Sequence, residues 1–86
     1  MASYRIEWRT SARKELRRLD RTVIPRIVDA VGTLATDPFP PGCRKLSGGE
    51  QTYRIRIGDY RVVYEVIGKC LIIEIVRVRH RKDAYR

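Results

Sequence analysis

The chain has 86 residues, which is enough for one domain with a single small core. Nineteen Lys and Arg residues against ten Asp and Glu residues give a net charge of +9, and a hydrophobic fraction of 43% argues against a disordered chain. The charge predicts a polyanionic partner, such as nucleic acid or the ribosome, or an acidic protein. No apolar run is long enough to span a membrane and no hydrophobic leader precedes the first elements, which predicts a cytoplasmic protein without a membrane partner.

Cysteine usage points away from metal chemistry. Cys43 and Cys70 are isolated in the sequence and have neither the spacing of a metal site nor that of a disulfide framework. We therefore expect two reduced thiols, no metal and no cofactor.

A strand and two helices are predicted at the start of the chain. Apolar and charged side chains alternate over residues 3–8, as in a half-buried strand. Thr10 or Ser11 is predicted to cap a helix over residues 10–19, and Thr22 one over residues 22–36 that ends before Pro38. The outer face of the first helix is either a solvated surface or a contact for RNA phosphates or an acidic partner, and it carries Arg13, Lys14, Arg17 and Arg18.

Residues 37–50 form the longest predicted loop, stiffened by prolines in its first half. Gly48 and Gly49 precede a strand rather than a helix, which argues against a phosphate-binding loop. Lys45 is expected to stay in water, and Leu46 to return to the core.

Residues 52–79 predict three consecutive antiparallel strands joined by two-residue turns. Gly58-Asp59 and Gly68-Lys69 each place glycine first, as a type II′ hairpin turn requires. The second turn pairs Glu65 with Ile72. Alternation then predicts a core face made of Tyr53, Ile55, Ile57, Tyr60, Val62, Tyr64, Val66, Leu71, Ile73 and Ile75.

The opposite face of this predicted sheet concentrates positive charge. The first turn places Arg56 opposite Arg61, with Arg54 nearby on the same face. Like charges that face each other across strands lower stability, so the cluster predicts a surface that binds an anion. An ordinary basic surface is the alternative.

Together these elements predict an α+β fold of one domain over residues 1–86. An N-terminal strand and a two-helix hairpin precede a three-stranded antiparallel meander. The four strands form one mainly antiparallel sheet with both helices on one face. The chain then ends in a basic tail over residues 80–86, in which His80 is either a proton-transfer group or an ordinary surface residue.

The order of these elements and three motifs resemble the RelE/ParE toxin superfamily of type II toxin–antitoxin systems. The motifs are Tyr53-Arg54-Ile55-Arg56, Gly58-Asp59-Tyr60-Arg61-Val62-Val63-Tyr64 and a terminal His80-Arg81 followed by Tyr85. The resemblance covers almost the whole chain, and the terminal motif favours the RelE-like branch. It implies an endoribonuclease that cuts messenger RNA in the A site of the 70S ribosome, through the RNA's own 2′-hydroxyl and without a metal. A ParE-like inhibitor of DNA gyrase, or a degenerate toxin that mainly binds its antitoxin, is the alternative.

The resemblance also implies roles for individual residues. The expected catalytic set is Arg54, Arg56, Arg61, His80, Arg81 and Tyr85. The expected RNA contacts are Arg13, Lys14, Arg17, Arg18, Lys45 and Arg79. The best-known site of this kind has lysines in place of Arg54 and Arg56. Because arginine stays protonated in proteins, either proton transfer falls to His80, Tyr85 or Glu65, or the activity is weak.

The resemblance further implies a partner protein. A cognate RelB-like antitoxin, acidic and partly disordered, is expected to wrap the basic surface and fold on binding. Operator DNA is expected to be contacted only through that complex.

Overall fold

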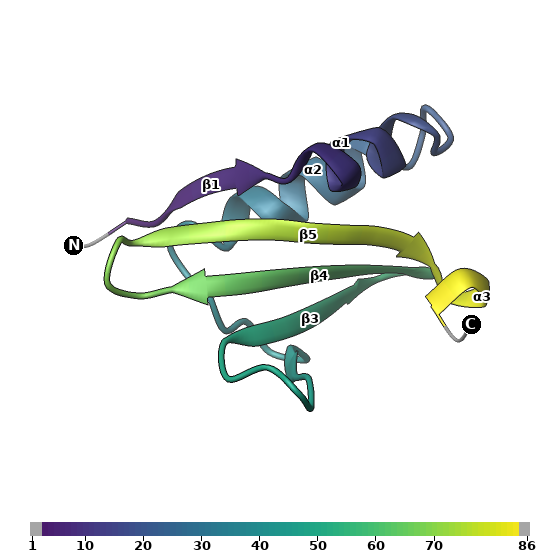
Figure 1. Ribbon diagram of the computed structural model, residues 1–86. Helices are drawn as coiled ribbons and strands as arrows, with labels where there is room; N and C mark the ends of the chain where they lie inside the picture. Colours follow the sequence, from purple (N-terminus) through teal and green to yellow (C-terminus); the bar gives the residue numbers. More distant parts are fainter. Residues whose placement is uncertain (1–2, 85–86) are drawn as a thin grey trace.

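A five-stranded sheet forms the centre of the molecule (Figure 1). The computed structural model describes residues 3–84, and the side chains of residues 3–82. The strands lie in the order β1, β5, β4, β3, β2, where β1 runs parallel to β5 and the other neighbours are antiparallel. The strands are β1 (Arg5–Trp8), β2 (Arg44–Lys45), β3 (Thr52–Ile57), β4 (Tyr60–Ile67) and β5 (Ile72–His80).

The architecture confirms the predicted α+β class and adds one strand. β2 lies within residues 37–50, where the sequence predicted a loop. Its two residues pair with β3, so that Arg44 faces Arg54 and Lys45 faces Tyr53. A strand of two residues is too short to produce an alternating pattern, which is why the sequence carried no signal for it.

Two helices cover one side of the sheet, as predicted (Figure 1). They are α1 (Thr10–Arg17) and α2 (Ile24–Thr33), both shorter than the predicted ranges 10–19 and 22–36. A one-turn helix, α3 (Arg81–Ala84), follows β5 where a tail was expected. None of the helices in the described part of the chain is long and apolar enough to cross a membrane.

The predicted helix caps are wrong. α1 begins behind Arg9 without a side-chain cap, although Thr10 or Ser11 was expected to supply one. The carboxylate of Asp20 accepts hydrogen bonds from the backbone N–H (2.9 Å) and the hydroxyl (2.8 Å) of Thr22, and these bonds lower the pKa of Asp20. Thr22 therefore belongs to the link between the helices rather than to the start of α2.

A single core lies between the helices and the sheet. Tyr64 is fully buried there, and its hydroxyl donates a hydrogen bond to the carbonyl of Pro38 (2.8 Å), which fixes the loop after α2 against the sheet. Burial raises the pKa of Tyr64, so the phenol stays neutral. The buried apolar residues are Ala12, Ile27, Val31, Leu34, Ile55, Val62, Tyr64, Val66, Ile73, Ile75 and Val78.

The first hairpin has the predicted register. Ile57 faces Tyr60 and Arg56 faces Arg61 across the Gly58-Asp59 turn. Gly58 has a φ of 59°, a backbone conformation that glycine adopts without strain and that the first position of a type II′ turn requires.

The second hairpin differs from the prediction by two residues. Residues 68–71 form its loop in place of a two-residue turn, so Glu65 faces Glu74 and not Ile72. The left-handed conformation in this loop falls on Leu71 (φ 53°), which is 40% exposed rather than part of the core. Because a slip of two residues preserves alternation, the other predicted core positions keep their face.

Candidate functional site

The sheet face turned away from α1 and α2 carries a row of three arginines. Arg56 of β3 lies opposite Arg61 of β4, which lies opposite Arg79 of β5. Residues that face each other across neighbouring strands project to the same side, so the three guanidinium groups share one face. The surface is called the arginine face below, and it consists of Arg54, Arg56, Arg61, Arg77 and Arg79.

A second row lies beside the first. It joins Arg54 of β3 and Arg77 of β5, with Val63 of β4 between them. Arg77 is exposed, whereas only 7% of Arg54 is exposed. Arg54 lines a groove of about 470 Å³ with Pro40, Pro41 and other residues at the edge of β3. It thus lies below the surface that Arg56 and Arg77 present.

A β-bulge at Val76 places Arg77 and Arg79 of β5 on the arginine face. Tyr64 pairs with Ile75 and Val63 pairs with Arg77, which leaves Val76 as an extra residue in β5. The extra residue changes the phase of the alternation. Unbroken alternation from Ile75 would turn Arg77 toward the core, and the bulge instead places it on the open face.

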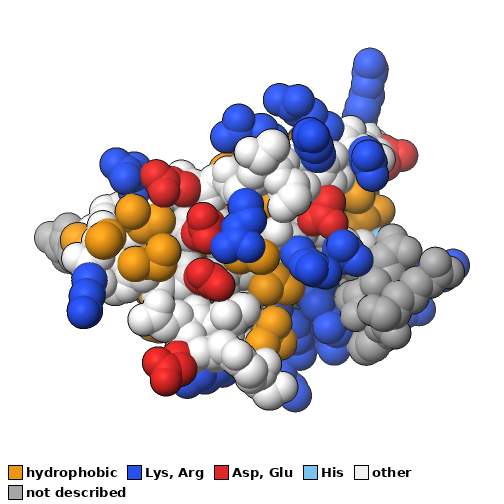
Figure 2. Space-filling model, in the orientation of Figure 1, with side chains coloured by type: hydrophobic (Ala, Val, Ile, Leu, Met, Phe, Trp, Pro, Cys, Tyr) orange, Lys and Arg blue, Asp and Glu red, His pale blue; other side chains and the backbone are white. Residues whose placement is uncertain are grey.

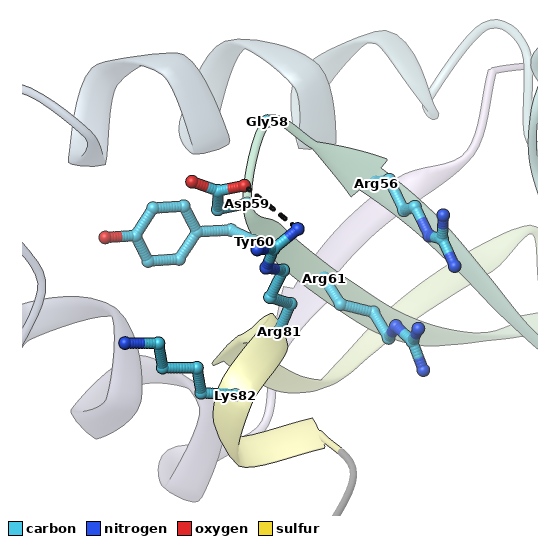
Figure 3. Close-up of a pocket in the computed structure, with 7 residues that line it drawn as sticks. All are labelled: Arg56, Gly58, Asp59, Tyr60, Arg61, Arg81 and Lys82. Carbon is cyan, nitrogen blue, oxygen red and sulfur yellow. Dashed lines mark ion pairs between the residues drawn. The ribbon is translucent and has the colours of Figure 1, made fainter.

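A pocket of about 290 Å³ lies where β3, β4 and α3 meet (Figure 3). It is lined by Arg56, Gly58, Asp59, Tyr60, Arg61, Arg81 and Lys82. In Figure 3 the side chains of Arg56 and Arg61 lie beside each other and point away from Asp59, whereas Arg81 turns toward Asp59. The pocket therefore brings together three of the predicted catalytic residues: Arg56, Arg61 and Arg81.

The turn between β3 and β4 anchors α3. The backbone N–H of Arg81 donates to the carbonyl of Asp59 (2.7 Å), and the side chains of the two residues form an ion pair of 4.0 Å. Both side chains are about two-thirds exposed, at 67% and 65%, so the ion pair itself contributes little to stability. The backbone hydrogen bond is what sets the start of α3.

His80 lies on the other face of β5 from Arg79. It faces Tyr60 across the strands, and the two rings meet edge to face with centroids 5.1 Å apart. Nδ1 of His80 accepts a hydrogen bond from the backbone N–H of Lys82 (3.2 Å). The imidazole is half-buried and does not line the pocket that contains Arg61.

The other end of the open sheet face is acidic. Glu7, Glu74 and Glu65 face one another in register across β1, β5 and β4. Arg9 donates a hydrogen bond to Glu74 (2.7 Å), and this contact raises the pKa of Arg9. Figure 2 shows acidic side chains left of and near the middle of the visible face, with Lys and Arg side chains beside them and on the right-hand part of the face.

The remaining residues predicted to contact RNA divide between two places. Lys45 is exposed in β2, at the sheet edge opposite β1. The basic residues of the first predicted helix are also exposed, and they form a separate surface on and just after α1, made of Arg13, Lys14, Arg17 and Arg18.

Some residues of the candidate site were not predicted from the sequence, and one predicted residue lies outside the part of the chain that the structure describes. Asp59 and Tyr60 belong to the quoted Gly-Asp-Tyr-Arg motif, so that motif could have identified them. Arg77 had no signal, because a bulge is not visible in the alternation. Tyr85 lies outside the described residues.

Comparison with known families gives a match over nearly the whole chain. The model of the family described as "ParE toxin of type II toxin-antitoxin system, parDE" matches residues 6–85. The chain is 30% identical over 86 residues to a putative toxin RelE1 of Methanocaldococcus jannaschii, an alignment that covers 96% of both chains. It is 33% identical over 87 residues to toxin RelG of Mycobacterium tuberculosis, covering 96% of this chain and 97% of the relative.

Solved structures give the same result. A chain of the archaeal RelE-RelB complex from Pyrococcus horikoshii superposes with a TM-score of 0.81 at 31% identity, covering 92% of this chain and 96% of that chain. A chain of the toxin-antitoxin complex RelBE2 from Mycobacterium tuberculosis gives a TM-score of 0.79 at 29% identity, covering 92% and 99%. The likeness therefore extends to the whole fold.

Proposed function

Because the chain belongs to the RelE/ParE superfamily of toxins of type II toxin–antitoxin systems, we propose that it is a ribosome-dependent endoribonuclease that cuts messenger RNA in the A site. The observation that supports the proposal most is the pocket in which Arg56, Arg61 and Arg81 meet. The names of the similar proteins support the RelE-like branch. RNA is the polyanion that such a cationic pocket would receive.

The proposed reaction needs stabilisation of negative charge. Attack of the RNA 2′-hydroxyl on the adjacent phosphate produces a pentacoordinate phosphorane that carries more charge than the starting diester. Arg56, Arg61 and Arg81 would supply fixed positive charge to that state. Guanidinium groups bind phosphate oxygens through two parallel N–H bonds, which favours one orientation of the phosphate.

Proton transfer needs a different group, because arginine stays protonated in proteins. Of the expected candidates, Glu65 lies on the open face, His80 lies on the opposite face, and Tyr85 falls outside the described residues. We propose that proton transfer belongs to Glu65 or Tyr85. His80 would instead support α3 through its hydrogen bond with Lys82.

A cognate antitoxin is the proposed protein partner. The two similar structures described above are both toxin-antitoxin complexes, and the one from Pyrococcus horikoshii is a RelE-RelB complex. With a net charge of +9, this chain would attract an acidic segment, and the arginine face is the surface that such a segment would neutralise. Antitoxin and RNA would then compete for the same arginines. Contact with operator DNA is proposed only through this complex.

A gyrase-directed activity is the second candidate, because the family model that matches is that of the ParE toxin. The two activities are separated by one pair of assays on the purified protein. Primer extension on programmed ribosomes is expected to show cuts within the A-site codon, and DNA supercoiling by gyrase is expected to be unaffected. Intact message together with inhibited supercoiling would replace the first candidate by the second.

A further inference from the structure

Glu15 of α1 binds β5 at two points. Its Oε1 accepts a hydrogen bond from the backbone N–H of Val78 (3.0 Å), and its Oε2 accepts one from Nε of Arg79 (2.9 Å). The register of β1 with β5 ends at Ile75, so α1 covers the next part of that strand edge. The side chains of Glu15 and Arg79 are 22% and 38% exposed, which leaves the contact partly shielded from water.

This contact fixes one end of the arginine row. Arg79 faces Arg61, which in turn faces Arg56. A guanidinium has N–H donors on Nε and on both Nη atoms. Glu15 engages Nε, so the Nη groups are the donors that a phosphate on this face would meet. The carboxylate also offsets part of the repulsion between neighbouring arginines.

We infer that Glu15 is a positioning residue for RNA cleavage: it holds Arg79 so that the Nη groups of Arg79 bind the RNA phosphate beside Arg61. The inference rests on the proposed function. Glu15 acts through Arg79 and does not itself contact the reacting atoms. Loss of such positioning costs up to about a hundredfold in rate when a catalytic group moves by roughly 1 Å.

Two substitutions separate this role from a structural one. Glu15→Gln keeps the size of the side chain, but its amide oxygen can accept only one of the two hydrogen bonds and its amino group accepts neither. Glu7→Gln is the matched control, because it removes the same charge from a carboxylate that is paired with Arg5 (3.2 Å) in β1. A change in cleavage rate that both variants share would come from the loss of one negative charge and not from the loss of the contact with Arg79.

The test is a double-mutant cycle on single-turnover cleavage by programmed ribosomes. Glu15→Gln is expected to cut roughly tenfold to a hundredfold more slowly than the parent protein. Arg79→Ala is expected to cut about a hundredfold or more slowly, because a charge-assisted donor is lost. The double variant should match Arg79→Ala, since Glu15 is inferred to act on cleavage only through Arg79. Glu7→Gln should stay within about twofold of the parent.

A second readout does not depend on cleavage. The Nε–H signal of Arg79 in a nitrogen–proton NMR spectrum should be protected from exchange in the parent and lose that protection in Glu15→Gln. Additive losses in the double variant, parental cleavage by Glu15→Gln, or an unprotected Arg79 signal in the parent would each overturn the inference. Absence of cleavage by the parent protein would overturn the proposed function instead. A protected Nε–H signal of Arg79 in that case would show that the contact between Glu15 and Arg79 serves the fold alone.

Discussion

The two ends of the open sheet face both hold like charges in register, but they differ in how those charges are balanced. At the acidic end Glu7, Glu74 and Glu65 lie in one row. Arg5 pairs with Glu7 (3.2 Å) and Arg9 pairs with Glu74 (2.7 Å) on the same surface. Two of the three carboxylates in this row are thus paired with arginines of the fold.

At the arginine end, two ion pairs with carboxylates lie at the margins of the face, where Glu15 binds Arg79 and Asp59 lies 4.0 Å from Arg81. Five arginines make up the face itself. A surface that gathers five guanidinium groups attracts anions, so the arginine end suits a polyanionic ligand.

Insertion of one alanine between Arg77 and Val78 should have the largest effect, because it shifts the alternation of β5 behind the bulge by one residue. Val78 would turn to the open face and Arg79 toward the core, and burying such a charge costs several kcal/mol. A domain of this size is stable by only about 5–15 kcal/mol, so we expect loss of cooperative unfolding in thermal circular dichroism. Val76→Ala keeps the residue count and should unfold cooperatively. An insertion variant with parental Tm would show that the strand tolerates the shift.

Replacement of Arg56 tests whether the arginine end, unlike the acidic end, binds RNA. Binding of a short single-stranded RNA is expected to weaken as salt rises, because phosphate contacts release counterions. Arg56→Ala should lower the slope of log affinity against log salt by about 0.7, the value for one contact with a single strand. Fluorescence anisotropy across a salt series measures this slope. An unchanged slope would remove Arg56 from the RNA-binding surface.

Replacement of Glu74 should have the smallest effect. Glu74→Gln removes the partner of Arg9 at the exposed acidic end, and exposed ion pairs contribute little to stability. The Tm is expected to fall by at most a few degrees, and by less in high salt. The salt slope for RNA should stay as in the parent. A large loss of stability would mean that the acidic row supports the fold more than its exposure indicates.

The first hairpin was predictable because one residue determines its turn. A glycine at the first turn position allows the left-handed backbone, and Gly58 adopts it. The second hairpin offered the same signal at Gly68, yet the left-handed residue there is Leu71. Competition between turns of different length depends on contacts along both strands, which the local sequence does not encode.

The candidate site was predictable where it depends on that first hairpin and not where it depends on the bulge. The pairing of Arg56 with Arg61 followed from the turn. The positions of Arg77, Arg79 and His80 followed from the extra residue in β5, which exchanges the faces of the last part of the strand. Simple alternation would have placed His80 on the arginine face, and Arg77 and Arg79 toward the core.

The rate of cleavage by the Arg61→Ala variant shows whether the arginine face carries the proposed reaction. Arg61 lies in the middle of the arginine row and lines the pocket, whereas Arg5 is an exposed arginine at the far side of the sheet. We expect Arg61→Ala to cut A-site codons about a hundredfold to a thousandfold more slowly than the parent in primer extension on programmed ribosomes. Arg5→Ala should cut at the parental rate, and both variants should stay folded. Equal rates for Arg61→Ala and Arg5→Ala would show that the arginine face does not carry the reaction.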